Sequence, residues 1–199
     1  MKPCHRHSGP GSTIGPRALA RALGTGVLAL LLFPFSMDAQ VSRPTEYQVK
    51  AAYLFNFGKF VKWPPSAPQD NFAICVLGSD PFHGVLDSTV SGERIDSKQV
   101  VVRRINSPTD ASGCRIVFVS ESEQNRMGSI LPILNRSPVL TVSDASGFVE
   151  RQGMIQFVMD GDRVRFKVNL SAAESAGLSM SSELLKVATE VKREEKSGD

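Results

Sequence analysis

The stretch EYQVKAAYLFNFGKFVKWPP, from Glu46 to Pro65, decides how the rest of the chain can be arranged. Apolar residues cover most of a helical wheel from Val49 to Trp63, which predicts a helix buried on more than one face. The two prolines that follow should end this helix, because proline lacks an N–H and restricts the residue before it. The aromatic end, Phe57–Trp63, belongs either to the core alone or also to a ligand or partner surface, and the sequence does not separate these roles.

Residues 1–39 have the layout of a secretory signal peptide. A polar, basic segment precedes the apolar run Ala22–Phe35, and the small residues Ser36 and Ala39 follow it. The run is shorter than the roughly 20 residues that a membrane-spanning helix needs. We therefore expect cleavage after Ala39, which leaves residues 40–199 as one exported, periplasmic domain. A retained membrane anchor is the alternative.

The positive charge of the chain lies largely in this leader. The whole chain has 23 Lys and Arg against 20 Asp and Glu, a net charge of +3. Four of the basic residues and one acidic residue precede residue 40, so the predicted mature chain is close to neutral. Nucleic-acid binding requires a basic face that neutralises phosphates, so we exclude it as a leading function.

The cysteines suggest a disulfide. Cys4 lies in the leader, which leaves Cys75 and Cys114, an even number in an exported chain. Two buried free thiols are the alternative. No C-x-x-C motif occurs, so a thioredoxin-like redox site is not indicated.

Short apolar runs alternate with helical patterns through the middle of the chain. The predicted strands are Phe72–Leu77, Val100–Val102, Cys114–Ser120 and Pro138–Val142, followed by a hairpin of Met154–Met159 and Arg163–Leu170 joined by Asp160-Gly161. The predicted helices begin at Asp80-Pro81, at Ser120, at Ser171 with Glu174 as a capping box, and at Ser181 or Ser182 with an apolar stripe reaching Val191.

This order of elements predicts an α/β fold. Strands that alternate with helices favour a mainly parallel sheet covered by helices on both faces. We expect a three-layer α/β/α sandwich, with the antiparallel hairpin at one edge of the sheet. Neither an internal repeat nor a linker is evident, so residues 40–199 should form one domain.

Groups for catalysis are scarce. His83 is the one histidine outside the leader, and it falls in the first turn of a predicted helix. The G-x-G strings lie in the leader, and no G-x-S-x-G occurs after it. We expect no enzymatic activity, no cofactor and no metal site.

Several residues are candidates for a partner or ligand surface. Arg103 and Arg104 form a basic pair at a strand end, which is either an ordinary solvated pair or an anion-binding point. The full candidate set is Phe57, Lys59, Phe60, Trp63, Arg103 and Arg104.

Four stretches carry a family resemblance. They are KAAYLFNFGKFVKWP at Lys50–Pro64, AICVLGSDPF at Ala73–Phe82, CRIVFVSESE at Cys114–Glu123 and MIQFVMDGDRVRFKVNLSAAESAGLSMSSELLKVA at Met154–Ala188. Together and in this order they resemble the YfiR family of periplasmic proteins that act with membrane-bound signalling enzymes.

The resemblance implies an exported α/β-sandwich protein that forms homodimers. It implies binding to the periplasmic domain of an inner-membrane diguanylate cyclase, repression of that enzyme, and hence control of cyclic-di-GMP and biofilm behaviour. Cys75 and Cys114 resemble a disulfide pair of the family. A second disulfide of the best-known member has no counterpart here, so the Cys75–Cys114 bridge is expected to be structural.

Two other functions stay open at this point. The membrane partner could be a different sensor enzyme, or the protein could be a periplasmic module that binds a small ligand. A pocket with convergent arginines would favour the ligand module. An exposed aromatic or methionine patch would favour a protein partner.

Overall fold

The computed structural model describes residues 43–67 and 70–193. The predicted signal peptide, residues 1–39, lies outside the described residues. Within the described part, no helix is long and apolar enough to cross a membrane.

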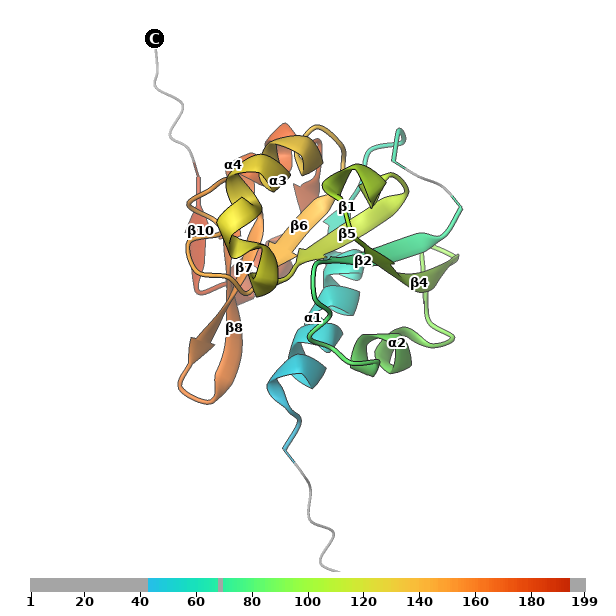
Figure 1. Cartoon of the computed structure of the whole chain (residues 1–199), viewed down its shortest axis with the longest axis horizontal. Coiled ribbons are helices and arrows are strands. Elements are labelled where there is room, and N and C mark those ends of the chain that lie inside the picture. Colours follow the sequence, from blue (N-terminus) through green and yellow to red (C-terminus); the bar gives the residue numbers. More distant parts are fainter. Residues whose placement is uncertain (1–42, 68–69, 194–199) are drawn as a thin grey trace, which may run out of the picture. The chain divides into compact units, whose positions relative to one another are not determined.

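Eight strands form one mixed sheet, and two short strands form a separate ribbon (Figure 1). The strands are β1 Val61–Lys62, β2 Phe72–Leu77, β3 Arg94–Ile95, β4 Lys98–Ile105, β5 Cys114–Val119, β6 Leu140–Ser143, β7 Ile155–Asp160, β8 Arg163–Asn169, β9 Ser179–Met180 and β10 Glu190–Lys192. The large sheet has the order β10-β8-β7-β6-β5-β2-β4-β3, and β1 pairs with β9. Within the large sheet the β7–β8 and β3–β4 pairs are antiparallel and the other neighbours are parallel; β1 and β9 are antiparallel.

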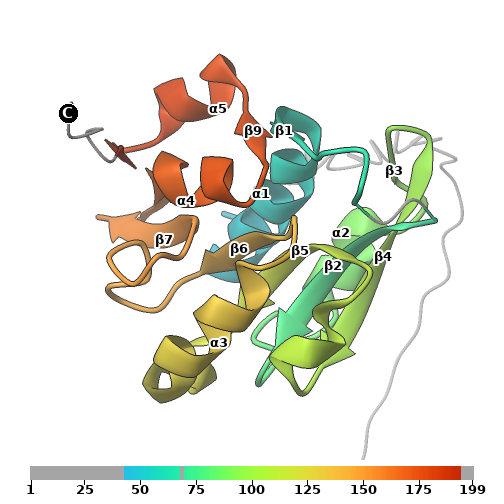
Figure 2. The same cartoon turned by 90° about the horizontal axis from the view of Figure 1, so that it is seen from above.

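The helices are α1 Glu46–Phe60, α2 Val85–Val90, α3 Met127–Leu134, α4 Leu170–Ser175 and α5 Ser182–Val187, with 3-10 turns η1 Pro108–Ala111 and η2 Glu121–Arg126. They lie on both faces of the sheet (Figure 2). One core joins α1, α2, α4 and α5 to the sheet, and a second core joins α3 and η1 to the opposite side of β2 and β5. Residues alternate between these cores along a strand: in β2, Ile74 and Val76 belong to the first, and Ala73 and Cys75 to the second.

The α/β class is therefore confirmed, but the finer expectation of a regular three-layer sandwich with a mostly parallel sheet is not. The sheet is mixed and curls into a half-barrel, with α1 packed in the first of the two cores. Strands β2, β5 and β6 are buried along their whole length because both faces of this part of the sheet are covered, whereas β4 is only partly buried.

Helix α1 ends earlier than expected. It stops at Phe60 rather than continuing to Trp63, because Val61 and Lys62 pair with Met180 and Ser179 as a β-ribbon. The prolines follow the ribbon, so they do not themselves end the helix. A distant strand partner, which local composition cannot reveal, sets this boundary.

The predicted hairpin is confirmed, but it is not the edge of the sheet. The pairing of Asp160 with Arg163 places Gly161 and Asp162 in the turn. Beyond β8 the chain adds β10 as a parallel edge strand, where an extension of the last helix to Val191 was expected. Helix α5 instead ends at Val187.

Two other helix starts were misplaced. Helix α2 begins at Val85 rather than at Pro81, because the Asp80 carboxylate accepts the Phe82 N–H at 2.8 Å and holds a turn there. His83, with a φ of 47°, precedes the helix instead of lying in its first turn. Helix α4 is capped by Asn169 rather than by the predicted Ser171.

Gly58 allows α1 to approach the sheet closely. A Cβ atom at this position would lie 2.5 Å from Ile95 Cδ1 and 2.8 Å from Phe72 Cζ. Gly128, on α3, has no such neighbour within 4 Å. The glycine in α1 is thus required by packing rather than by backbone conformation.

Candidate partner-binding groove

An apolar groove lies between the end of α1 and α5. Its volume is about 250 Å³, and its lining residues are Tyr53, Asn56, Phe57, Phe60, Phe166, Glu183, Leu184 and Val187. Six of these eight side chains are apolar or aromatic, so the groove offers contact area to an apolar group rather than a set of reactive groups.

The β1–β9 ribbon holds the two walls of the groove together. The carbonyl of Phe60 accepts a hydrogen bond from the Ser181 N–H at 2.9 Å. The Ser181 hydroxyl in turn accepts the Leu184 N–H at 3.2 Å and caps α5. The end of α1 and the start of α5 are therefore fixed to each other by main-chain contacts.

The floor of the groove is buried and its rim is exposed. The Phe57 ring is 1% exposed and packs edge-on against Phe166, with ring centroids 5.1 Å apart. Phe60 is 40% exposed and Val187 is 52% exposed, and both lie on the rim. Exposed large apolar side chains beside a groove are typical of surfaces that bind an apolar segment of another protein.

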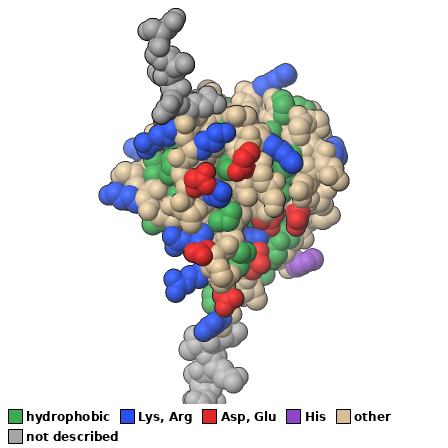
Figure 3. All heavy atoms as spheres, turned by 90° about the vertical axis from the view of Figure 1, so that its left-hand side faces the viewer, with side chains coloured by type: hydrophobic (Ala, Val, Ile, Leu, Met, Phe, Trp, Pro, Cys, Tyr) green, Lys and Arg blue, Asp and Glu red, His purple; other side chains and the backbone are tan. Residues whose placement is uncertain are grey.

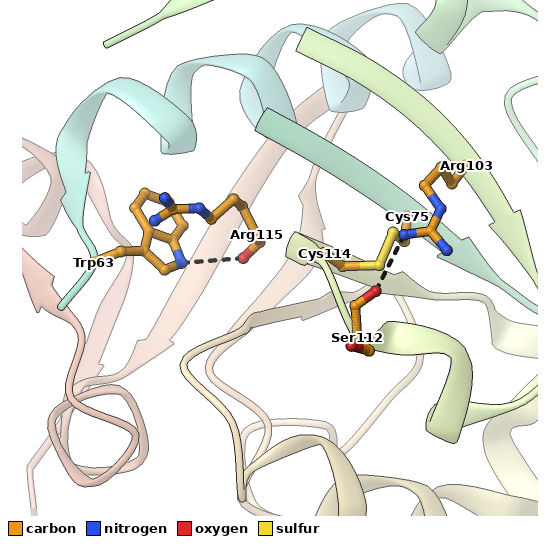
Figure 4. Close-up of a disulfide and its surroundings, with 6 residues drawn as sticks. All are labelled: Trp63, Cys75, Arg103, Ser112, Cys114 and Arg115. Atoms are coloured by element: carbon orange, nitrogen blue, oxygen red, sulfur yellow. Dashed lines mark hydrogen bonds between the residues drawn. A yellow bond between two sulfur atoms is a disulfide. The ribbon is translucent and has the colours of Figure 1, made fainter. Parts of the chain in front are cut away.

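The four candidates from the first helix region are placed differently. Phe57 lies in the core and Phe60 lies on the groove rim. Lys59 is exposed, with its Nζ 4.1 Å from the centre of the Phe55 ring. Trp63 is half-buried, and its indole Nε1 donates to the Arg115 carbonyl at 3.2 Å (Figure 4). These residues do not share one surface.

Arg103 and Arg104 point away from each other across β4. Arg103 Nη1 donates to the Ser112 carbonyl at 3.2 Å, beside the disulfide (Figure 4). Arg104 forms ion pairs with Asp80 at 2.7 Å and with Asp87 at 2.5 Å. Its hydrogen bond to Asp87 lowers the pKa of that carboxyl and raises the pKa of Arg104. The charge of Arg104 is thus already neutralised by two carboxylates.

The disulfide between Cys75 and Cys114 is present. It joins neighbouring parallel strands β2 and β5, with Cα atoms 6.0 Å apart. Both cysteines are completely buried in the core under α3. This position supports a structural role rather than an exposed, exchangeable bridge.

The sequence did not indicate a buried polar cluster at the start of α1. Lys50 is 3% exposed, and its Nζ lies 2.6 Å from Asp144 Oδ2 and 2.5 Å from Glu46 Oε1. The Tyr47 hydroxyl donates to the same Asp144 oxygen at 3.0 Å. Burial, and then the negative charge of Asp144, raise the pKa of Tyr47. Lys50 appeared in the sequence only as a polar interruption of an apolar helix.

Candidate metal ligands and the single histidine outside the predicted leader are dispersed in the described part of the chain. Within residues 43–67 and 70–193, no three His, Cys, Asp or Glu side chains converge on a possible metal position. His83 is exposed, and its backbone occupies the left-handed region ahead of α2.

Solved structures share parts of this fold at low sequence identity. A conserved domain protein from Vibrio cholerae matches with a TM-score of 0.52 and 11% identity, covering 74% of this chain and 60% of that one. An ABC domain in complex with L-Trp from Streptococcus pneumonia matches with a TM-score of 0.45 and 13% identity, covering 61% of this chain and 56% of that one. The chain thus spans less than two thirds of either protein, and the first likeness shows the fold alone.

The family comparison is more specific. A model described as YfiR/HmsC-like matches residues 47–189, from the second residue of α1 to the residue before β10. This family supports a periplasmic regulatory role in cyclic-di-GMP signalling in general. Because the match covers well over half of its 199 residues, the chain belongs to the YfiR/HmsC-like family.

Proposed function

We propose that the protein is a periplasmic regulator that binds the periplasmic domain of an inner-membrane signalling enzyme. The proposed partner is a diguanylate cyclase, which the bound protein represses, so that cyclic-di-GMP falls. The family match over residues 47–189 carries this proposal.

The groove between α1 and α5 is the proposed contact surface. Phe60 and Val187 present apolar area on a rim that main-chain hydrogen bonds hold in place. A groove of about 250 Å³ has room for one or two apolar side chains of a partner. Repression requires that the protein bind the inactive state of the enzyme more tightly than its active state.

The proposal includes export and maturation. Residues 1–39 act as a cleaved signal peptide, and residues 40–199 form the secreted domain. The buried Cys75–Cys114 bridge suits an oxidising compartment. We also propose that the mature protein is a homodimer that acts as a regulator rather than as a catalyst.

The test is a pull-down of the mature protein from the periplasm, with bound membrane proteins identified by mass spectrometry. Cellular cyclic-di-GMP is measured in parallel, with and without the gene. The wild-type protein should recover a diguanylate cyclase, and deletion should raise cyclic-di-GMP.

The groove is tested with the double variant Phe60→Ser and Val187→Ser. Ile133→Ser is the matched control, because Ile133 on α3 is 38% exposed and does not line the groove. The double variant should lose the partner and fail to lower cyclic-di-GMP, whereas the control should keep both.

Other outcomes would change the proposal in defined ways. Recovery of a histidine kinase or receptor would contradict the cyclase assignment. Equal recovery by the groove variant and the control would contradict the surface assignment. No membrane partner together with unchanged cyclic-di-GMP would overturn the regulatory proposal itself.

A further inference from the structure

Met159, near the turn of the β7–β8 hairpin, brings a sulfur atom to the protein surface. It is 49% exposed, whereas the other methionines that the structure describes are buried: Met127 and Met154 are 0% exposed and Met180 is 9% exposed. A thioether is oxidised by reagents that reach it from solvent, so exposure decides which methionine reacts first. Exposure thus singles out one methionine of the described chain.

The cysteines do not compete for such a reagent. Cys75 and Cys114 are joined to each other and are 0% exposed. Thiol oxidation proceeds through an accessible thiolate, which a buried disulfide does not provide. Within residues 43–67 and 70–193, Met159 is therefore the sulfur-containing residue that an oxidant meets from solvent.

The register of the sheet explains why this methionine is exposed. Strand β6 ends at Ser143, which pairs with Gln156, so β7 extends beyond it from Phe157 onward (Figure 1). Alternation along the strand places Met159 on the same face as Phe157, which is buried, but two residues nearer the turn, where burial decreases. Figure 3 shows the molecule from the side of β8 and β10, where hydrophobic side chains reach the surface among charged ones.

Two hollows adjoin Met159. One, of about 520 Å³, is lined by Met159 together with Val49, Tyr53 and Val164, the last of which is its partner across the hairpin. The other, of about 280 Å³, is lined by Met159 and Tyr47 among other residues. A molecule as small as hydrogen peroxide has room to approach the thioether from either hollow.

We infer that Met159 is a site of reversible oxidation by two-electron oxidants of the peroxide class. The sulfur lone pair attacks one peroxide oxygen, the O–O bond breaks, and the departing hydroxide takes up the remaining proton of the transferred oxygen to form water. The product is methionine sulfoxide. A methionine sulfoxide reductase reverses the step: two of its thiols become a disulfide, and the oxygen leaves as water.

The fold tolerates this modification. Oxidation converts an apolar side chain into a polar one, which disrupts a core when the methionine is buried. About half of Met159 already reaches solvent, so water can hydrate the added oxygen. The ring contacts of Phe57 with Phe157 and Phe166 lie deeper and do not involve Met159. The hollow beside α1 becomes more polar while the core stays packed.

The test is timed oxidation of the purified mature protein with hydrogen peroxide, stopped with catalase and followed by peptide mass spectrometry. Met154 is an internal control, because it lies with Met159 in one tryptic peptide, residues 152–163, and fragment spectra assign the added oxygen to either residue. In the folded protein Met159 should gain oxygen at least about tenfold faster than Met127, Met154 or Met180. In urea the four rates should agree within about twofold, because unfolding removes the difference in exposure.

Met159→Leu tests the assignment in the whole protein, since leucine keeps the volume and removes the sulfur. The folded variant should gain oxygen no faster than the buried methionines of the wild type. Reductases of the A and B types, supplied with reduced thioredoxin, should return the oxidised, folded wild type to its original mass. Oxidation at Met159 should lower the thermal midpoint by at most about 3 °C, because its oxygen is hydrated.

Each part of the inference can fail separately. Equal rates for Met159 and Met154 in the folded protein would overturn the argument from exposure. Failure of both reductases on the folded protein, with repair of the same tryptic peptide, would overturn reversibility. A fall in the thermal midpoint well beyond 3 °C would show that the sulfoxide disrupts packing. None of these measurements involves the membrane partner, so its absence in the pull-down leaves this test unaffected.

Discussion

The buried ion pair of Lys50 and Asp144 allows a quantitative test of how α1 is anchored. Replacing Asp144 with alanine removes the carboxylate that lies 2.6 Å from Lys50 Nζ. The ammonium group stays beneath the surface, over the Tyr47 ring at 4.4 Å and with the side chain 4% exposed. It retains Glu46, whose side chain is 43% exposed and therefore interacts through a more polar medium.

The expected loss of stability comes mainly from the charge left behind. At an effective dielectric constant of about 20, two charges 2.6 Å apart attract by roughly 6 kcal/mol, which the desolvation of both ions largely offsets. Removal of one partner leaves the other desolvated without compensation, which costs about 3–5 kcal/mol. We expect Asp144→Ala to lower the free energy of unfolding by about 3 kcal/mol, the lower end of this range, because Glu46 remains in contact with Lys50.

A double-mutant cycle separates this cost from the value of the pair. Lys50→Met keeps the stem volume and removes the charge, so the double variant Lys50→Met and Asp144→Ala leaves no orphan ion. The double variant should lose about 2 kcal/mol less free energy of unfolding than the two single variants lose in sum. Urea unfolding followed by circular dichroism gives each free energy, with unchanged m-values as the check on two-state behaviour.

The control is a carboxylate in an exposed ion pair. The Asp87 side chain is 46% exposed and pairs with Arg104, so Asp87→Ala should lower the free energy of unfolding by at most about 1 kcal/mol. Additive single losses, or a loss for Asp144→Ala no larger than that for Asp87→Ala, would refute the reasoning from burial.

Three further predictions follow from features of the fold. Replacing both Cys75 and Cys114 with alanine should lower the free energy of unfolding by about 4 kcal/mol in urea, since the bridge closes a separation of 39 residues; a loss below about 1 kcal/mol would contradict the loop-entropy argument. Gly58→Ala should destabilise by about 1–3 kcal/mol because its Cβ clashes with the sheet, whereas Gly128→Ala should be neutral or stabilise by up to about 1 kcal/mol; thermal melting that ranks the two in the opposite order contradicts the packing argument. Tyr47, whose pKa is raised in the folded state, stays protonated above pH 10 while the unfolded chain loses that proton, so stability is complete below about pH 10 and falls above it. Tyr47→Phe should reduce this alkaline loss in unfolding curves measured across pH, and an identical slope in both proteins would contradict it.

Elements with a strong local pattern could be predicted from the sequence. The run FAICVL is apolar throughout, and β2 is indeed covered on both faces by separate cores. The hairpin followed from alternation around a turn with Asp and Gly, and its register matches that alternation. In both cases the signal is contained within a few neighbouring residues.

Short elements that depend on a distant partner could not be predicted. The ribbon of β1 and β9 has two residues in each strand, and β10 has three. Such lengths carry no periodicity, so the chain adopts them only because Val61 meets Met180 and Val191 meets Val168. The wrong ends of α1 and α5 have this common cause.

The candidate surfaces illustrate the same limit. The sequence pointed to both Phe57 and Phe60, which lie three residues apart on one helix. Because this helix is apolar on nearly all sides, its sequence does not show which of the two side chains faces solvent. Val187 was expected on the apolar stripe of the last helix, yet it is 52% exposed, because α5 ends at this residue.

The long-range position of α1 has a consequence for how the protein assembles in the cell. One side of this helix packs against the β7–β8 hairpin, where the Phe57 ring centroid lies 5.9 Å from that of Phe157 and 5.1 Å from that of Phe166. About 100 residues separate Phe57 from these two partners, so they must be synthesised before this side of the helix can be buried. Until then the chain exposes apolar side chains of this helix to chaperones. Truncation before the last strands should therefore produce aggregation rather than a smaller folded protein.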